Sequence, residues 1–173
     1  MRSATLSDYR WLYDHGYMPD GLKCARAILP DIVAKGPATF LDWGCGRGEL
    51  VDYINADTLG AAHGCDPATS YPSPFVGNTW DWIISCDVLE HIPEDEIDAT
   101  LRDMRLFATK GLLLTIANMS DVHAVNGEQV ELHLIQEPMP WWTEKLREHF
   151  PTATIRGRHI EADSSRFAIV VEF

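Results

Sequence analysis

The sequence has no apolar run long enough to cross a membrane. Its 173 residues contain no stretch of 18 consecutive apolar side chains, and a bilayer-spanning helix needs about 20. Residues 1–16 carry charges throughout and lack the apolar core of a signal peptide, so export is not expected. The length suits one domain better than two. We therefore expect a single cytoplasmic domain over residues 1–173.

Basic residues are scarce. The chain has 14 Lys and Arg against 26 Asp and Glu, a formal net charge of −12. Proteins that bind bulk nucleic acid neutralise phosphates with clustered Lys and Arg, and the densest basic stretch here is only residues 156–159. Bulk nucleic acid is thus not an expected partner, and the sequence gives no indication of an oligomeric state.

Cysteines are few and scattered. The four residues Cys24, Cys45, Cys65 and Cys86 lie about twenty positions apart, which fits neither a disulfide framework nor a zinc ribbon. We expect them to be reduced. The ligand-type residues Glu131, His133 and His123 match no standard metal-site spacing, so no metal is predicted.

Helical and strand patterns alternate along the chain. Helices are predicted over residues 5–15, 20–34, 48–56, 94–108 and 140–150, and strands over residues 38–43, 59–66, 80–87, 111–117, 152–160 and 165–173. Alternation of this kind predicts an α/β, Rossmann-like sandwich with a mostly parallel sheet. The last two strands have no helix between them and should pair antiparallel as a C-terminal hairpin.

Two segments are predicted to be irregular. Residues 67–79 hold three prolines and a glycine, with room for one short strand at most, so the fold is shortened between its second strand and the strand over 80–87. Residues 118–136 are predicted to form a long polar loop. Long loops are seldom idle, and this one is the candidate substrate lid.

The stretch "FLDWGCGRGEL" places three glycines between a strand and a helix. Gly44, Gly46 and Gly48 allow positive φ and let a ligand approach the backbone, and the helix N-terminus favours an anion. The preceding Asp42 would repel a pyrophosphate but attract an ammonium group. A ligand with both a carboxylate and an ammonium group is an amino acid. A turn that serves geometry alone is the alternative.

Asp66 ends the second predicted strand, about twenty residues beyond the glycines. An acidic residue at this place meets the two hydroxyls of a ribose, although an aspartate before a proline is also a common turn residue. An amino acid at one end and a ribose at the other describe S-adenosylmethionine.

The segments "LDWGCGRGEL", "GCDP" and "WDWIISCDVLEHIPEDEI" together resemble the class I S-adenosylmethionine-dependent methyltransferases. The "DVLEHI" ending resembles the small-molecule branch of that family, with phage and glycan-cluster members. The resemblance covers residues 38–117 and the closing hairpin. It implies S-adenosylmethionine as the cofactor and the following cofactor-binding residues: Asp42, Gly44, Cys45, Gly46, Asp66, Pro67, Phe75, Cys86, Asp87 and His91.

The chain departs from the family pattern after Asp66. Family members usually have a further helix and strand here, ending in an acidic residue that holds the adenine amino group. No Asp or Glu lies between Asp66 and Asp81. Adenine would then be held by backbone groups and by packing on Tyr71, Phe75 or Pro67.

Two histidines of the predicted loop are candidates for catalysis. His133 or His123 could take a proton from an acceptor hydroxyl. The stretch "HLIQEPMPWW" resembles phage and glycan-cluster methyltransferases in which a histidine precedes a helix with paired tryptophans, which favours His133. For His91 the alternative is a helix-entry residue, and Trp141 and Trp142 are interpreted as core anchors.

The predicted function is methyl transfer from S-adenosylmethionine to an oxygen or nitrogen of a small-molecule or sugar-like acceptor. One alternative is a binding module that keeps the cofactor and has lost turnover. A nicotinamide-dependent oxidoreductase is the other, and both Asp42 and the tight glycine spacing disfavour it.

Overall fold

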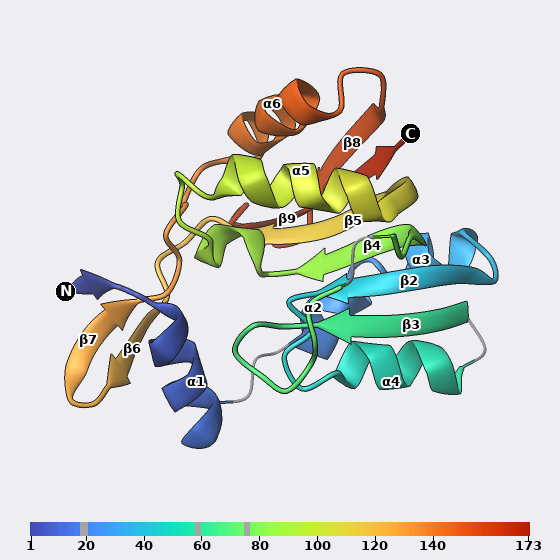
Figure 1. Cartoon of the computed structure of the whole chain (residues 1–173). Helices are drawn as coiled ribbons and strands as arrows, with labels where there is room; N and C mark the ends of the chain where they lie inside the picture. Colours follow the sequence, from blue (N-terminus) through green and yellow to red (C-terminus); the bar gives the residue numbers. More distant parts are fainter. Residues whose placement is uncertain (18–20, 58–59, 75–76) are drawn as a thin grey trace.

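The main body of the protein is a six-stranded sheet with helices on both faces (Figure 1). The structure, a computed structural model, describes residues 1–17, 21–57, 60–74 and 77–173. The strand order is β3-β2-β4-β5-β9-β8. Pairing is parallel from β3 to β5, and β9 lies antiparallel to both β5 and β8. This confirms the predicted α/β sandwich and its antiparallel hairpin.

The elements follow the predicted order closely. The helices are α1 (Leu6–Asp14), α2 (Gly21–Arg26), α3 (Leu29–Ala34), α4 (Glu49–Ala56), α5 (Ile97–Phe107) and α6 (Met139–His149), with a 3-10 turn η1 (Leu89–His91). The sheet strands are β2 (Ala38–Trp43), β3 (Gly60–Cys65), β4 (Trp80–Cys86), β5 (Ala108–Ala117), β8 (Thr154–His159) and β9 (Arg166–Glu172). A second sheet holds β1 (Arg2–Ser3), β6 (Val122–Val125) and β7 (Glu128–Glu131).

The core lies on both faces of the six-stranded sheet. On one face α5 and α6 pack over it, with Ile97, Leu101 and Trp142 fully buried. On the other face lie α2, α3 and α4, with Ile28, Ile32 and Ile54 fully buried. The central strand β5 is almost wholly buried, as its continuous apolar sequence predicts for a strand covered on both faces.

The helix predicted over 20–34 is wrong in part, because the structure has two short helices there. The chain turns between α2 and α3, and Pro30 falls in the first turn of α3. Proline lacks an amide hydrogen and fits the start of a helix, not its interior. Helical spacing of apolar residues continued across the break, so periodicity alone did not reveal it.

The long loop predicted over 118–136 is also wrong, because it contains the β6–β7 hairpin. The hairpin turns at Asn126 and Gly127, whose φ angles are 49° and 83°. Two consecutive residues with positive φ give the turn that matches strand twist, and Asn-Gly is its strongest sequence signal. The edge of β7 pairs in parallel with β1, which joins the N-terminus to this hairpin.

The segment between β3 and β4 is short, as predicted. No helix or strand occurs in the described parts of 66–79, and β3 is the edge of the sheet. The chain leaves β2 toward β3 and returns through β4 on the opposite side of β2. Strand order therefore reverses between β2 and β4, where open α/β sheets form a crevice at the carboxyl ends of their strands. No helix among the described residues has the length and apolar character needed to cross a membrane.

Candidate functional site

The glycine loop between β2 and α4 has a backbone that only glycine adopts easily. Gly44, Gly46 and Gly48 have φ angles of 77°, 55° and 83°. The amides of Gly44 and Cys45 both donate to the carbonyl oxygen of Cys65, at 2.8 and 3.1 Å, and tie the loop to the end of β3. A Cβ atom at Gly44 would lie only 2.5 Å from a methyl group of Val88. The loop is thus closely packed and can hold only glycine at Gly44 without moving Val88.

Two buried carboxyl groups flank this loop. Asp42 is 4% exposed and Asp66 is 7% exposed. The carboxylate of Asp66 accepts hydrogen bonds from the amides of Gly46, at 2.9 Å, and Ala68, at 2.7 Å. Burial raises the pKa of Asp66. Burial, and then the nearby charge of Asp66, raise the pKa of Asp42 to about 7. The crevice therefore holds unfavourable negative charge that a cationic ligand group would relieve.

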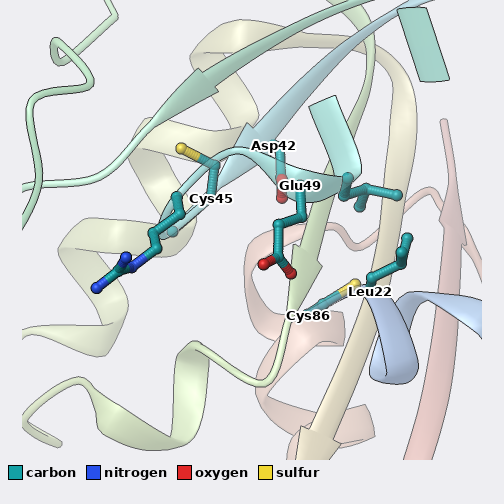
Figure 2. A pocket seen from close by; sticks show the side chains of 8 residues that line it. Leu22, Asp42, Cys45, Glu49 and Cys86 are labelled. Atoms are coloured by element: carbon teal, nitrogen blue, oxygen red, sulfur yellow. The ribbon is translucent and has the colours of Figure 1, made fainter. Parts of the chain in front are cut away.

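A pocket opens beside these groups, between the end of β2, the start of α4 and the end of β4 (Figure 2). Its empty volume, part of which is open to solvent, is about 360 Å³. Figure 2 shows the Glu49 carboxylate between Asp42 and Cys86, with the Cys45 side chain directed away from them. The lining residues are Leu22, Asp42, Gly44, Cys45, Arg47, Glu49, Leu50 and Cys86.

The N-terminal helix α1 covers one side of the crevice. Arg10 donates to the carbonyl oxygen of Pro67 at 3.0 Å, and Arg47 of the glycine loop donates to the carbonyl oxygen of Tyr13 at 2.8 Å. Burial raises the pKa of Tyr13, with the charge of Asp66 as the next cause. On the loop's other side, Tyr71 lies against Gly48 and Gly64. Two aromatic side chains thus stand next to the predicted cofactor residues.

Asp87 follows β4 and has a φ angle of 52°. Its carboxylate accepts a hydrogen bond from the Thr115 hydroxyl at 2.8 Å and forms an ion pair with Arg166 at 2.8 Å. It does not belong to the residues that line the pocket, whereas its neighbour Cys86 does. Asp87 connects β4, β5 and β9 at the carboxyl edge of the parallel strands.

A second polar cluster, made of Glu90, His91 and His133, lies just past the end of β4. Glu90 is fully buried, and one of its oxygens accepts a hydrogen bond from the Ala117 amide at 2.7 Å. Burial raises the pKa of Glu90 well above its ordinary value. Burial also lowers the pKa of His91 to about 4, with the His133 charge as the next cause. The imidazole rings of His91 and His133 pack edge to face, with their ring centroids 4.6 Å apart.

The other predicted catalytic histidine, His123, lies on the β6–β7 hairpin and outside this cluster. Its Nε2 is 2.9 Å from a carboxylate oxygen of Asp121, and its ring contacts the ring of Tyr17. Glu131 is directed at backbone: one oxygen accepts from the amides of Asp121 and His133, at 2.7 and 3.1 Å. Of the loop residues considered as ligands from the sequence, the structure brings only His133 to a cluster of ligand groups.

Four of the ten predicted cofactor residues line the pocket: Asp42, Gly44, Cys45 and Cys86. Gly46 and Asp66 adjoin it through their mutual hydrogen bond. Asp87, His91 and the exposed Pro67 do not line the pocket. Phe75 lies outside the described residues. The three cysteines with described side chains, Cys45, Cys65 and Cys86, are free thiols.

Sequence reasoning missed Glu90 and Tyr9. The hydroxyl of Tyr9 lies 2.9 Å from Nδ1 of His91 and donates to the carbonyl oxygen of Leu132 at 3.0 Å. A signal for Glu90 existed in the sequence, since an acid between Leu89 and His91 directly after a buried strand is an unusual place for a charge. Nothing local marked Tyr9, because its partners are about 80 and 120 residues away.

Several solved structures share this architecture over nearly the whole chain. DhpI in its complex with SAM and HEP aligns at 13% identity over 96% of this chain and 94% of its own, with a TM-score of 0.74. The fold is that of the Rossmann-like methyltransferases. No protein-family model and no curated protein sequence matches the chain.

Two further structures with the methyltransferase fold carry a bound cofactor product. The 1,6-didemethyltoxoflavin N1-methyltransferase of Burkholderia thailandensis, with its substrate and S-adenosylhomocysteine, is 16% identical over 96% of this chain and 86% of its own, at a TM-score of 0.65. The magnesium protoporphyrin IX methyltransferase of Synechocystis PCC 6803, with S-adenosylhomocysteine, is 18% identical over 94% of this chain and 92% of its own, at a TM-score of 0.58.

The crowded backbone at Gly44 leads to a prediction about stability. Gly44→Ala should destabilise the protein more than Gly127→Ala. Both positions have positive φ, which costs alanine about 1–2 kcal/mol, but only Gly44 has a neighbouring side chain within reach. Overpacking against Val88 should add about 1–3 kcal/mol. Urea denaturation of the two variants measures the difference, and equal losses would show that the loop tolerates a Cβ.

Proposed function

We propose that the protein transfers a methyl group from S-adenosylmethionine to an oxygen or nitrogen of a small-molecule acceptor. The observation that carries this proposal is the pair of buried carboxyl groups, Asp42 and Asp66, around a glycine loop at the switch point of the sheet. Asp42 suits the ammonium group of the methionine end, and the N-terminus of α4 suits its carboxylate. Asp66 suits the ribose hydroxyls.

The named activities of similar structures support a small acceptor. Two of them are named for methyl transfer to 1,6-didemethyltoxoflavin and to magnesium protoporphyrin IX. S-adenosylmethionine already carries an activated methyl group, so the protein must align the acceptor and exclude water. The segment over 118–136, which carries the β6–β7 hairpin, is the proposed acceptor lid. His133 is the proposed catalytic residue ahead of His123, because it is buried beside the end of β4.

The cofactor assignment predicts selective binding. Calorimetry should detect binding of S-adenosylhomocysteine to the protein and no binding of NAD. Asp66→Ala should weaken S-adenosylhomocysteine binding about 10- to 100-fold, since losing a hydrogen bond to a charged partner costs about 1.5–3 kcal/mol. Asp103→Ala, on the exposed face of α5, is the matched control and should bind normally. Binding of NAD instead, or unchanged affinity in Asp66→Ala, would contradict the assignment.

The raised pKa of Asp42 predicts a pH dependence of binding. The ionised carboxylate attracts an ammonium group and the protonated form does not, so S-adenosylhomocysteine affinity should rise about five- to tenfold from pH 6.0 to 7.5, with the pKa of Asp42 at about 7. This range stays below the titration of the ligand's own amine. Asp42→Asn should bind weakly and show no such rise.

The same substitution should stabilise the ligand-free protein. A carboxyl group whose pKa is raised by folding favours the folded state at low pH, and that contribution is lost as pH rises through 7. Asp42→Asn removes the buried charge and should raise the melting temperature at pH 7.5. Weaker binding together with higher stability distinguishes a ligand-binding group from a structural one. Lower stability with unchanged binding would overturn this role.

Turnover separates an enzyme from a binding module. Incubating the protein with S-adenosylmethionine and a library of hydroxylated and amine acceptors should release S-adenosylhomocysteine, detected by mass spectrometry. His133→Ala should lower the rate at least tenfold while leaving S-adenosylhomocysteine affinity unchanged. Full activity in His133→Ala would remove this residue from catalysis.

A further inference from the structure

Glu90, His91 and His133 offer three metal-ligating groups at one place. One ligand atom from each lies within 4.8 Å of the others. Glu90 and His91 belong to the turn η1, and His133 follows β7 about forty residues later. Metal–ligand bonds of about 2.0–2.2 Å place neighbouring ligand atoms about 3–3.5 Å apart. Small side-chain rotations would therefore bring all three groups onto one ion.

Glu90 has an unsatisfied oxygen in this cluster. Its side chain is fully buried, Oε1 accepts from the Ala117 amide, and Oε2 has no hydrogen-bond partner among the described residues. Burying a carboxylate oxygen without a partner is costly. A bound cation would satisfy this oxygen. The charge of Arg166 also acts on Glu90, but the Arg166 guanidinium forms its ion pair with Asp87 at 2.8 Å.

Both histidines have one nitrogen held by main chain. Nδ1 of His91 lies 3.0 Å from the carbonyl oxygen of Leu132, and Nδ1 of His133 lies 2.5 Å from that of Met119. A carbonyl oxygen only accepts, so each Nδ1 carries the hydrogen and each Nε2 keeps a lone pair. Fixing the tautomer in this way is how proteins orient metal-ligating histidines. The Asp121 carboxylate, 3.9 Å from Nε2 of His133, adds negative potential.

We propose that Glu90, His91 and His133 bind one divalent first-row transition metal ion. Two imidazoles and one carboxylate form a donor set that suits such ions and leaves coordination positions open, whereas Mg²⁺ and Ca²⁺ prefer oxygen ligands. The proposal rests on the proposed function and narrows it, because the open positions would hold an oxygen of the acceptor. His133 then acts on the acceptor through the ion and not as a free base.

The cluster lies at the same edge of the sheet as the pocket. Cys86 lines the pocket at the end of β4, Glu90 follows it by four residues, and the Glu90 carboxylate contacts Ala117 at the end of β5. A metal ion lowers the pKa of a bound hydroxyl group. The proton of the acceptor hydroxyl would leave to water, and a lone pair of the acceptor oxygen would form the bond to the methyl carbon. The electrons of the broken sulfur–carbon bond would stay on the sulfur of S-adenosylhomocysteine. The ion keeps its oxidation state.

The test is a titration with Mn²⁺ of protein that a chelator has stripped of metal. Electron paramagnetic resonance measures binding as the loss of the signal of free Mn²⁺. The wild type should bind one ion per chain, and binding should raise its melting temperature. Glu90→Gln and His133→Asn should each weaken Mn²⁺ binding at least tenfold. His159→Asn, an exposed histidine on β8, is the control for adventitious binding and should behave as the wild type.

Calorimetry with S-adenosylhomocysteine on each variant shows whether the fold and the cofactor crevice are intact. Mn²⁺ affinity that is equal in the wild type and in a correctly folded Glu90→Gln variant would overturn the metal site. So would the absence of Mn²⁺ and Zn²⁺ binding by the wild type. S-adenosylhomocysteine binding without metal binding would leave the proposed function standing, and metal binding without S-adenosylhomocysteine binding would contradict the function alone.

Discussion

Two buried carboxyl groups that repel each other, with no ion pair to either among the described residues, create the constraint on which this site depends. Asp42 and Asp66 are both less than a tenth exposed, and each has a raised pKa. Hydrogen bonds offset part of the free-energy cost of burying the Asp66 carboxylate, which accepts from two main-chain amides. Burial and the charge of Asp66 oppose the ionisation of Asp42 near neutral pH. A ligand with an ammonium group removes that opposition, so binding energy is available where the ligand must be held.

The fold places this charge where a ligand can reach it. Parallel strands end at a common edge, and the reversal of strand order between β2 and β4 opens the sheet there. The glycine loop is tied to the end of β3 through the Cys65 carbonyl, which keeps its amides in place. The second sheet then connects the N-terminus with the β6–β7 hairpin, and α1 links this unit to the glycine loop through Arg47 and to the Pro67 carbonyl through Arg10. The crevice and the β6–β7 hairpin, which we propose as the acceptor lid, are thus connected through α1.

The sequence was most informative at the ends of the apolar strands. The glycine loop, Asp42 and Asp66 fell at strand ends because short apolar runs and glycines mark those ends. It was uninformative where contacts are distant, as for Tyr9 with His91, or β1 with β7. The hairpin within 118–136 was missed although Asn126–Gly127 signalled it, because polar strands that form a small separate sheet resemble a loop in hydropathy. Glu90 and His133 come together only through tertiary packing, which no spacing rule describes.

The central claim is that the crevice between β2 and β4 holds a zwitterion and a sugar diol at successive strand ends. A crystal structure grown with S-adenosylhomocysteine tests it most directly. The account predicts the ligand's ammonium group beside Asp42, its carboxylate on the main chain of the glycine loop, and its ribose hydroxyls on Asp66. Density for the ligand elsewhere, or an empty crevice at saturating ligand, would contradict it.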